Sequence, residues 1–477
     1  RTATALSVGR DHVCATLDNG SLKCWGRSGS GQLGLGDTLA RGDGPGEMGD
    51  LLPAVDLGSI DEIFSVSLGN RFSCAVVDTE FVFGSRRVKC WGYNSAGQLG
   101  LGDFDYRGDD AGEMGDALPT VDLGSYTLNI VGTPVTFQNS PRVISAGDFH
   151  VCAIYNGDEG PVKCWGGNAS GQLGLGDDGF RGDDAGEMGD SLPPVDLGAG
   201  RTATSISAGG YHTCALLDDG SVKCWGSNGD GQLGLGDTED RGDDAGEMGD
   251  ALPTVDLGEG RTAVSIAAHY DHNCALLDDG SVKCWGYNYQ GGLGLGDSDD
   301  RGDEPGEMGD DLPSVDLGTI LAVASVESGN WFSCALIRTG VIPSTRLKCW
   351  GANFDGQLGL GDDDARGDGA GEMGDDLSYV DLGRTDLGIQ LNVTTAAVGN
   401  GHVCAIVNAG SLKCWGKNNA GQLGYEDTEP RGDDAGEMGD ALEEVELGSG
   451  RTAVAISAGR YHSCAILDDG SVKCWGY

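Results

Sequence analysis

Carboxylate side chains gather in a glycine-rich segment that the chain repeats seven times. In its fourth copy the acidic residues include Asp237, Asp243, Glu247 and Asp250. Hard cations such as Ca²⁺ take about six to eight oxygen ligands, and glycine-rich turns let backbone carbonyls join carboxylates around the ion. The spacing matches no EF-hand loop. The segment therefore predicts Ca²⁺ in some of the copies, and the alternative is a solvated acidic face held by an arginine.

An Arg-Gly-Asp tripeptide occurs at one constant position of this segment. Its arginines are Arg41, Arg107, Arg181, Arg241, Arg301, Arg366 and Arg431. In isolation the tripeptide suggests adhesion of the integrin type. Because Gly-Glu-Met-Gly-Asp follows it in every copy, we interpret the tripeptide as a repeated fold element whose arginine pairs with a neighbouring carboxylate. An adhesive ligand is the alternative.

Six of the seven histidines occupy one position, two residues before the first cysteine of a repeated strand pair. They are His12, His150, His212, His272, His402 and His462. Phe72 and Phe332 fill this position in the other two copies, and phenylalanine neither binds a metal nor transfers a proton. We therefore predict packed histidines that hydrogen-bond to the backbone.

The sequence holds no constellation of catalytic residues. It has no nucleophile elbow, zinc-protease helix or phosphate loop, and Gly-Leu-Gly-Asp lacks the strand-then-helix setting of a nucleotide fingerprint. The same carboxylate pair recurs seven times, whereas a catalytic site would break the symmetry of the repeats. We expect a chain that is not an enzyme and that requires no cofactor.

A β-hairpin positions these residues, and in the fourth copy it reads Cys214-Ala-Leu-Leu-Asp-Asp-Gly-Ser-Val-Lys-Cys224-Trp-Gly226. An Asp-Gly pair between alternating apolar runs indicates such a turn. A three-residue loop with Gly220 in the left-handed region places Cys214 opposite Cys224. Directly opposite Cα atoms lie roughly 4.5–5.5 Å apart, which suits a disulfide. We predict one cross-strand disulfide in each copy.

All sixteen cysteines enter this scheme. The predicted pairs are Cys14–Cys24, Cys74–Cys90, Cys152–Cys164, Cys214–Cys224, Cys274–Cys284, Cys334–Cys349, Cys404–Cys414 and Cys464–Cys474. An even set with constant placement indicates an oxidising compartment. Reduced cysteines that fill the sheet faces are the alternative. A metal site is disfavoured because one pair in each unit cannot complete a tetrahedral ligand set.

The sequence of each unit predicts three strands, the long loop and an outer fourth strand. In the fourth unit we expect strands over 204–209, 211–217 and 221–226, and an outer strand over 252–257 with Pro253 at an edge position. No segment shows a helical period, so the fold class is all-β. Short strands that recur at a fixed period are typical of a β-propeller.

Four motifs recur in these units: Gly-Gln-Leu-Gly-Leu-Gly-Asp, Gly-x-x-His before the second strand, Asp-Gly at the hairpin and Trp-Gly after it. In these motifs the chain resembles the regulator of chromosome condensation repeat family over essentially its whole length. The resemblance implies a propeller, typically of seven blades, with loops on either face for partners. The family resembled includes nuclear exchange factors for small GTPases, and its fold includes secreted inhibitors of enzymes such as β-lactamase.

Residues 1–477 are expected to form a single array of seven or eight four-stranded blades, with eight hairpin units by count. Because only seven long loops accompany the eight units, an eight-bladed ring, a seven-fold ring with an extra hairpin and a piece of a longer chain all remain open. Inserts occur at 125–141 and 384–395. The eight Cys-Trp-Gly tryptophans are expected to pack between blades, and the extra Trp331 is expected to be exposed.

The balance of charge is strongly acidic, with 75 Asp and Glu against 30 Lys and Arg and a net charge of −45. Such a chain lacks the basic footprint of a nucleic-acid binder. No apolar run reaches about 18 residues, so we expect no membrane span. Sequons at Asn19, Asn168 and Asn392 join the cysteines in predicting a secreted or cell-surface glycoprotein. The chain begins at Arg1 without a leader-like segment, which we interpret as a mature or excised piece.

Together these features predict a non-enzymatic, extracellular structural or binding propeller, and they suit a subunit of a cell-surface or filamentous assembly. Its partners are expected to be other proteins, copies of itself or glycans. The alternative is a protein-binding propeller that inhibits an enzyme or regulates a small GTPase. An inhibitor would need an aromatic face, for which Tyr211, Tyr287, Tyr289 and Trp331 are the candidates.

Overall fold

The computed structural model describes residues 1–60, 62–78, 86–130, 133–156, 160–319, 322–340 and 344–477. Two compact units divide the chain. The N-terminal unit comprises residues 7–229 and 239–255, and the C-terminal unit comprises residues 1–6, 230–238 and 256–477. The described residues form eight three-stranded sheets and one two-stranded sheet, and their only helices are single 3₁₀ turns. The prediction of an all-β chain is therefore confirmed.

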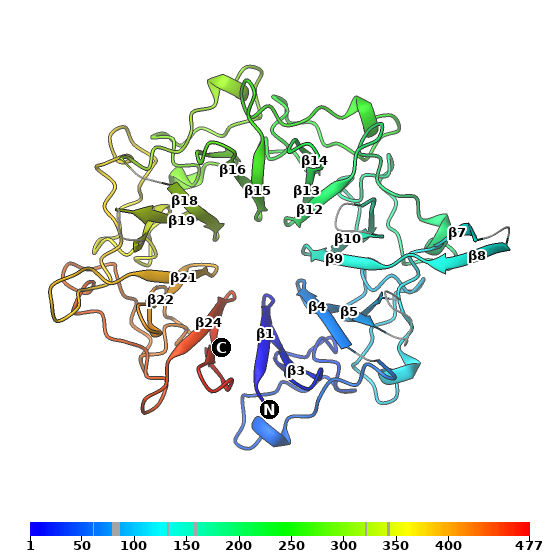
Figure 1. Cartoon of the computed structure of the whole chain (residues 1–477), viewed down its shortest axis with the longest axis horizontal. Helices are drawn as coiled ribbons and strands as arrows, with labels where there is room; N and C mark the ends of the chain where they lie inside the picture. The colour runs from blue at the N-terminus through cyan, green and yellow to red at the C-terminus, as the bar shows by residue number, and fades with distance from the viewer. Residues whose placement is uncertain (61, 79–85, 131–132, 157–159, 320–321, 341–343) are drawn as a thin grey trace. The chain divides into compact units, whose positions relative to one another are not determined.

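The N-terminal unit contains sheets that follow one another along the chain. Their strands are β2 (His12–Leu17), β3 (Leu22–Gly26), β4 (Glu62–Leu68), β5 (Phe72–Asp78), β6 (Arg86–Gly92), β9 (Pro141–Ala146), β10 (His150–Tyr155), β11 (Val162–Gly166), β12 (Ala203–Ala208), β13 (His212–Leu217) and β14 (Val222–Gly226). The first strands β4, β9 and β12 contact one another in series, and the sheets fan out from them with the long loops on the opposite side (Figure 1).

The C-terminal unit repeats this arrangement. Its strands are β15 (Ala263–Ala268), β16 (His272–Leu277), β17 (Val282–Gly286), β18 (Ala322–Ser328), β19 (Phe332–Thr339), β20 (Ser344–Gly351), β21 (Val393–Val398), β22 (His402–Val407), β23 (Ser411–Gly416), β24 (Ala453–Ala458), β25 (His462–Leu467) and β26 (Val472–Gly476). The first strands β15, β18, β21 and β24 again contact one another in series.

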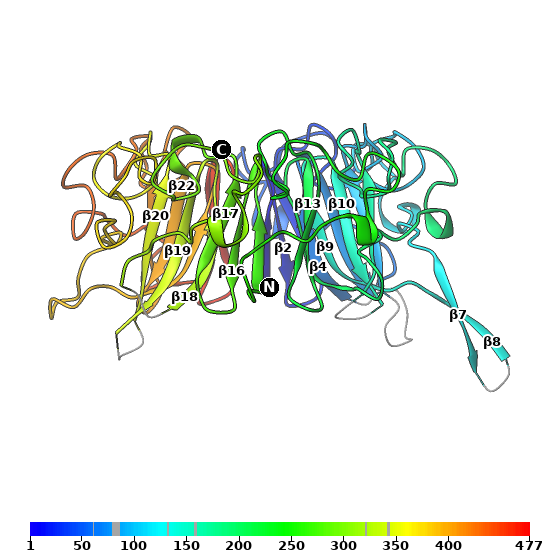
Figure 2. The same ribbon diagram turned by 90° about the horizontal axis from the view of Figure 1, so that it is seen from above.

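The remaining elements are short. Strand β1 (Ala3–Val8) opens the chain, and the 3₁₀ turns are η1 (Gly49–Leu51), η2 (Gly115–Ala117), η3 (Gly189–Ser191), η4 (Gly249–Ala251), η5 (Tyr289–Gly291) and η6 (Gly309–Asp311). Most of the insert at 125–141 forms a projecting hairpin of β7 (Ser125–Ile130) and β8 (Thr133–Gln138) (Figure 2). The insert at 384–395 forms a loop closed by a backbone bridge between Arg384 and Gln390, and its end enters β21. None of the described helices is long and apolar enough to cross a membrane.

The hairpin register is the one that the sequence predicts. Cys214 lies directly opposite Cys224, and Leu216 lies opposite Val222. Gly220 has a φ of +81°, the left-handed conformation that closes the turn,. All eight predicted disulfides are formed, each across one hairpin with Cα atoms 4.1 Å apart. No cysteine is left free.

The predicted outer strand at 252–257 is an extended segment and not a regular strand. It is joined to β14 by one backbone hydrogen bond, from Val255 N–H to the Val222 carbonyl at 2.8 Å. Pro253 has no N–H to offer, and Leu252, Val255 and Leu257 turn their side chains into the core. The blades of the described structure therefore have three ladder-forming strands, and apolar burial holds the fourth segment.

Seven of the eight Cys-Trp-Gly tryptophans donate to a backbone carbonyl in the loop of the preceding repeat, and the exception is Trp25, whose buried Nε1 has no such partner among the described residues. Trp165 is fully buried, and its Nε1–H donates to the Gln98 carbonyl at 3.1 Å. Gly100 lies against this indole with a φ of +67°, and a Cβ there would come within 3.0 Å of the ring. The corresponding bond of Trp350 goes to the Gly292 carbonyl at 3.1 Å. Because the acceptor is a backbone oxygen, glycine replaces glutamine there without loss of the bond.

The start of β1 forms a backbone hydrogen bond to the eighth hairpin that also occurs at the start of two other first strands. Ala3 N–H donates to the Gly470 carbonyl at 2.7 Å, as Ala453 N–H donates to Gly410 at 2.7 Å. Ala203 and Gly160 form the same bond at 3.0 Å. Residue 3 is therefore joined to the eighth hairpin in the way that the other two first strands are joined to the hairpin before them.

Candidate functional site

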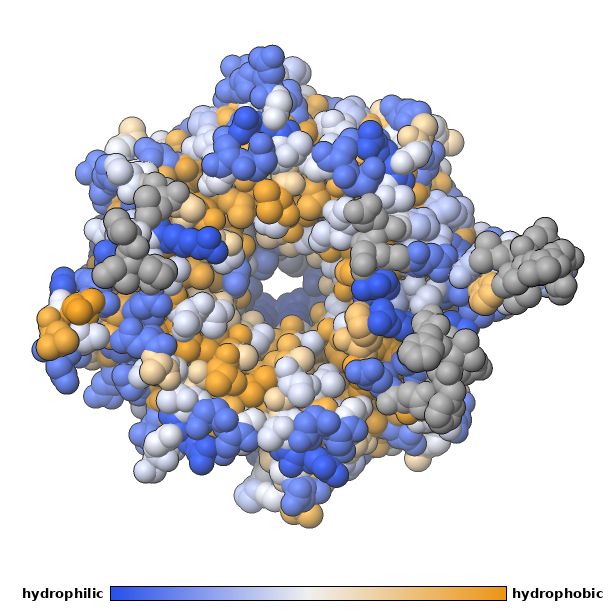
Figure 3. Space-filling view, in the orientation of Figure 1, coloured by the Kyte–Doolittle hydropathy of each residue, from blue (hydrophilic) through white to orange (hydrophobic). Residues whose placement is uncertain are grey.

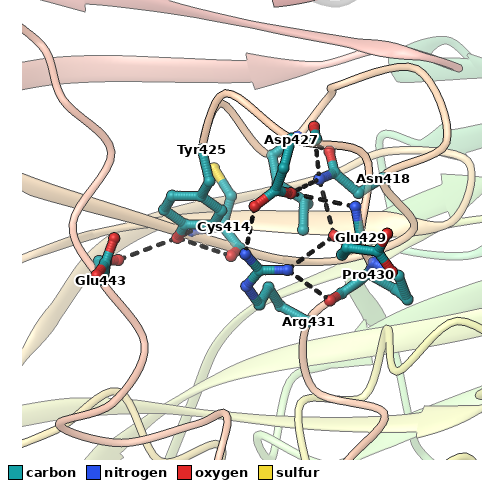
Figure 4. A network of polar contacts seen from close by, with 9 residues as sticks. Cys414, Asn418, Tyr425, Asp427, Glu429, Pro430, Arg431 and Glu443 are labelled. Carbon is teal, nitrogen blue, oxygen red and sulfur yellow. Dashed lines mark hydrogen bonds and ion pairs between the residues drawn. The ribbon is translucent and has the colours of Figure 1, made fainter.

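The long acidic loop is organised by its arginine. In the seventh repeat the Arg431 guanidinium donates to the Asp427 carboxylate at 2.6 Å and to the carbonyls of Glu429 and Pro430, both at 3.0 Å (Figure 4). Asn418 donates to the Asp427 carbonyl at 3.1 Å and to the Glu429 carbonyl at 2.8 Å. The loop is thus a closed hydrogen-bonded turn that has little freedom to reshape around a ligand.

In the seventh repeat Tyr425 replaces the second leucine of Gly-Gln-Leu-Gly-Leu-Gly-Asp, and it strengthens the same loop. Its hydroxyl donates to the Cys414 carbonyl at 2.9 Å and also lies 3.0 Å from the Glu443 carbonyl (Figure 4). Burial raises the pKa of Tyr425 far above its ordinary value. The phenol therefore stays neutral and ties the third strand to the extended segment beyond the loop.

The Arg-Gly-Asp tripeptide carries out this structural role in repeat after repeat. Ion pairs of 2.5–2.6 Å join Arg41 to Asp37, Arg107 to Asp103, Arg181 to Asp177, Arg301 to Asp297, Arg366 to Asp362, and Arg431 to Asp427. In the fourth repeat the glycine amide of the tripeptide, Gly242 N–H, donates to Glu247 at 2.8 Å. An adhesive ligand presents its arginine and aspartate to a receptor, whereas these arginines are already engaged. The geometry favours the interpretation as a fold element.

The four residues chosen as Ca²⁺ ligands have separate partners. Glu247 accepts the amides of Gly242 and Asp244, and Asp250 accepts the amide of Ala199 at 2.9 Å. Burial, followed by the charge of Glu247, raises the pKa of Asp243. Asp237 begins the loop at the position of Asp427. Across the described residues no three His, Cys, Asp or Glu side chains gather closely enough to hold a metal ion. Ca²⁺ binding stays a prediction.

The repeated histidines are packed between neighbouring sheets, and their observed partner is a side-chain hydroxyl. His150 is fully buried, and its Nε2 lies 2.8 Å from the Thr213 hydroxyl of the next sheet. The same contact joins His12 to Ser73, His272 to Ser333, and His402 to Ser463. Where phenylalanine fills the position, Phe72 belongs to one apolar cluster with Val151, and Phe332 to another with Val403. The neighbouring side chain is thus a hydroxyl beside these four histidines and a valine beside the two phenylalanines.

Burial makes this position sensitive to acid. It lowers the pKa of His150 from its ordinary 6.5 to about 3. The unfolded chain therefore takes up a proton below pH 6.5 while the folded chain does not, so the stabilisation is complete above pH 6.5 and falls as the pH is lowered. At pH 5 the loss is about 2 kcal/mol for this residue.

The double variant His150→Phe with Thr213→Val copies the Phe72–Val151 pair. We expect it to unfold with a weaker dependence on pH between 6.5 and 4 than the parent chain, measured by urea denaturation. The single variant His150→Phe is the control, because it leaves the Thr213 hydroxyl beside an apolar ring and should be less stable than the double variant. Equal pH dependence in the parent and the double variant would contradict the assignment.

The three sequons differ in accessibility. Asn168 is fully buried and donates to the carbonyls of Asp177 at 2.6 Å and Gly179 at 3.0 Å. It holds the acidic loop as Asn418 does, and this burial disfavours a glycan at Asn168, where glycosylation stays a prediction. Asn19 is exposed at a hairpin turn, and Asn392 is half-buried. Glycosylation at these two residues stays a prediction.

The C-terminal unit carries an exposed cluster of aromatic side chains, which we call the aromatic patch. It is formed by Tyr287, Tyr289, Trp331 and Phe354. The Tyr289 ring lies 5.1 Å from Trp331 edge to face, 6.0 Å from Tyr287 in a stacked arrangement, and 6.3 Å from Phe354. Tyr289, Trp331 and Phe354 remain 39, 37 and 55% exposed. Contiguous exposed aromatic surface of this kind marks an interaction site.

Two adjacent repeats supply the patch. The tyrosines follow β17, Trp331 precedes β19, and Phe354 follows β20 at the position that corresponds to Tyr289. Trp331 has a φ of +66°, which is costly for a residue with a side chain,. Its carbonyl accepts the amide of Ala352 at 2.8 Å, which holds this conformation. Gly292, the one departure from glutamine, lies beside it, where a Cβ would come within 3.3 Å of the Trp331 carbonyl.

Carboxylates border the aromatic patch. Burial, followed by the charges of Asp230 and Asp300, raises the pKa of Tyr287. Asp300 accepts the Asn288 amide at 2.6 Å, and burial raises the pKa of both Asp230 and Asp300. Aromatic faces next to carboxylates attract cationic side chains through cation–π and ionic contacts.

The sequence identified part of this patch. It singled out Tyr287, Tyr289 and Trp331, which the structure brings together, whereas Tyr211 lies in the N-terminal unit beside Phe149. Phe354 was missed. Its signal was the alignment of repeats, because it fills the position of Tyr289 one unit later, where most other copies carry a small or polar residue.

Two family models for the regulator of chromosome condensation repeat match segments of this chain. One covers residues 3–32, 142–172, 203–232, 263–291, 393–422 and 453–477, and the other covers residues 159–216 and 219–276. The chain belongs to the regulator of chromosome condensation repeat family. Its fold is the β-propeller of that family, with a disulfide added to each hairpin.

Curated relatives agree with this family. The ultraviolet-B receptor UVR8 of Arabidopsis thaliana is 27% identical over 89% of this chain and 79% of its own. The E3 ubiquitin-protein ligase HERC2 of Homo sapiens is 26% identical over 87% of this chain, but that match spans 7% of the ligase. The ligase activity therefore does not follow for this family member.

Solved structures support the fold. Human WBSCR16 aligns with a TM-score of 0.60 at 20% identity, over 91% of this chain and 96% of its own. Prp20p of Saccharomyces cerevisiae, described with its binding properties to Gsp1p and histones, aligns with a TM-score of 0.55 at 18% identity, over 100% of this chain and 92% of its own. At these identities the likeness shows the fold and no shared partner.

Proposed function

We propose that this propeller is an extracellular protein-binding module that contacts its partner through the aromatic patch. The observation that carries the proposal is the joining of Tyr289, Trp331 and Phe354 into one exposed surface beside a strained backbone. Interfaces draw most of their affinity from a few aromatic side chains that lose water on binding. Strain at Trp331 is expected where a side chain must be presented.

The chemistry of the partner follows from charge. The chain carries a net charge of −45, and Asp230 and Asp300 border the patch. A protein surface that offers lysine or arginine among apolar side chains is complementary to it. Because part of this attraction is between exposed charges, affinity is expected to fall as salt is raised.

The extracellular setting rests on the hairpins. Eight disulfides with no free cysteine are stable in an oxidising compartment and would be reduced in the cytosol,. The loops that line the rim of each unit are predominantly hydrophilic on the face shown in Figure 3. These features also suit a structural subunit of a cell-surface or filamentous assembly, which is the broader form of the same proposal.

A matched pair of variants tests the proposal. Photo-crosslinking from position 354 on the folded protein, in its native extracellular setting, recovers the partner, whose affinity is then measured by surface plasmon resonance. Trp331→Ala with Phe354→Ala is expected to weaken binding about thirtyfold, the effect of about 2 kcal/mol. Phe104→Ala is the control, because Phe104 is similarly exposed at 53% but lies in the N-terminal unit. An equal loss of affinity in the double variant and in Phe104→Ala, or no loss in either, would refute the site.

Relatives favour a second candidate, the regulation of a small GTPase. Prp20p is described with its binding to Gsp1p, and the Schizosaccharomyces pombe protein pim1 is 27% identical over 60% of this chain. An exchange factor would accelerate release of a fluorescent guanine nucleotide from a GTPase. No acceleration across a panel of small GTPases is expected if the extracellular proposal holds.

A further inference from the structure

A polar cavity of about 310 Å³ lies in the N-terminal unit, between β6, the extended segment 120–123 and the end of the insert at 125–141. Val88 and Val121, both buried, form part of its wall. The polar residues that line it are Arg87, Thr120, Asp122, Gln138 and Asn139. Because Asp122 and Gln138 are exposed, the cavity is open to solvent. Pockets that bind small molecules measure about 300–1,000 Å³ and combine apolar walls with a few polar groups.

The sixth repeat places the same two polar side chains together in the C-terminal unit. Arg87 and Arg346 stand three residues before the second cysteine of their hairpins, where the other six repeats have serine or proline. Gln138 and Gln390 stand three residues before the first strand that follows, β9 and β21 respectively. The Arg346 guanidinium donates to the Gln390 side chain at 2.9 Å. The sixth repeat is therefore an internal reference for the cavity of the second.

A tyrosine ring lies beside this arginine in the sixth repeat. The Arg346 guanidinium lies over the Tyr379 ring, 4.2 Å from its centroid, and the Lys348 ammonium lies 4.8 Å from the same centroid. Thr120 holds the position of Tyr379 in the second repeat, one residue before the valine whose N–H donates to the third strand. The cavity adjoins Thr120. It therefore corresponds to the place of a ring that the second repeat does not carry in its own sequence.

The side chains around the cavity are held in fixed positions. Lys89 corresponds to Lys348, and it donates to two backbone carbonyls, each at 2.8 Å, as Lys348 donates to the corresponding two. Arg87 Nη1 donates to the Arg86 carbonyl at 2.8 Å. Asn139 is buried, and its amide donates to a backbone carbonyl at 2.8 Å. A wall that is already ordered loses little conformational freedom when a ligand binds.

We propose that this cavity binds a small molecule that carries a phenol ring. The ring takes the place that Tyr379 takes in the sixth repeat, with the Arg87 guanidinium over its face. Asp122 and Asn139 suit the hydroxyl group, since a carboxylate accepts a hydrogen bond and an amide both donates and accepts. The site belongs to the N-terminal unit and shares no residue with the aromatic patch, so it is a second binding site.

Methyl NMR of the intact, oxidised protein with labelled valine tests the proposal. Val121 lines the cavity, and Val380 is its counterpart next to Tyr379. On titration with p-cresol, the side-chain analogue of tyrosine, we expect saturable shifts at Val121 and none at Val380. 4-Methylcyclohexanol has a similar shape without an aromatic face, and it is expected to bind about tenfold more weakly.

A substitution that fills the cavity with the chain's own ring sharpens the test. Thr120→Tyr copies Tyr379 and is expected to abolish the binding of p-cresol. Thr254→Tyr is the matched control, because Thr254 holds the same position in the fourth repeat, where Ser221 stands in place of Arg87. It is expected to leave p-cresol binding unchanged.

Two further variants examine the arginine and the ring separately. Arg87→Ala is expected to weaken p-cresol binding about tenfold. Tyr379→Thr is expected to open the equivalent cavity in the sixth repeat, seen as new saturable shifts at Val380. No saturable shift at Val121 in the parent chain, or equal p-cresol binding by the parent and Thr120→Tyr, would overturn the proposal. Equal affinity for p-cresol and 4-methylcyclohexanol would overturn it as well.

Discussion

Reduction of the eight disulfides is expected to unfold this protein at temperatures where the oxidised form is stable. Each bridge closes a separate loop of 10–16 residues. In the chain-entropy model, closure of such a loop contributes about 3 kcal/mol. Because the loops do not overlap, their contributions add, and the sum exceeds the stability of about 5–15 kcal/mol that a typical domain has.

The measurement is a thermal unfolding curve by circular dichroism with and without reductant, with reduction verified by intact mass. Removal of one bridge alone, by Cys214→Ala with Cys224→Ala, should lower the free energy of unfolding by about 3 kcal/mol and leave the fold intact. An unchanged unfolding temperature of the fully reduced chain would show that packing and not cross-linking supplies the stability.

Replacement of Trp165 by alanine is expected to lower the free energy of unfolding by about 3–5 kcal/mol, the range for large aromatic residues cut to alanine in a core. Its indole is fully buried within an apolar cluster that includes Leu99 and Val121. The substitution also leaves the Gln98 carbonyl without its donor, which adds the cost of an unsatisfied buried acceptor.

Urea denaturation of Trp165→Ala, Trp165→Phe and Trp331→Ala separates these contributions. Trp165→Phe keeps most of the packing and loses the hydrogen bond. Its free energy of unfolding should therefore lie between those of the parent and the alanine variant. Trp331 is 37% exposed, and its replacement should change stability little. A small effect at Trp165 would mean that the neighbouring sheets close over the space the ring leaves.

Much of the fold could be predicted because its strongest signals are local. The Asp-Gly turn determines the register that places Cys214 opposite Cys224, and the same residues recur in eight hairpins. The outer segment at 252–257 was predicted as a short strand with Pro253 at an edge position. That only one backbone hydrogen bond, from Val255 to Val222, joins it to β14 could not be foreseen, since burial and not ladder formation decides its conformation.

The candidate site could be predicted only in part because it depends on contacts between repeats. Tyr289 and Phe354 lie 65 positions apart in the sequence and 6.3 Å apart in space. The Thr213 hydroxyl that His150 contacts is likewise 63 positions away along the chain. A sequon at Asn168 reads as a surface signal, and only the closed loop around it reveals a buried side chain.

The bond between Ala3 and Gly470 has a mechanical consequence. It holds residues near both ends of the sequence in one place, so a pulling force applied there would load this contact before it reached the sheets. Once this hydrogen bond breaks, we expect the chain to extend through the long acidic loops, while each hairpin stays closed by its disulfide. Under tension the protein would thus extend in steps and keep eight short hairpins that remain folded.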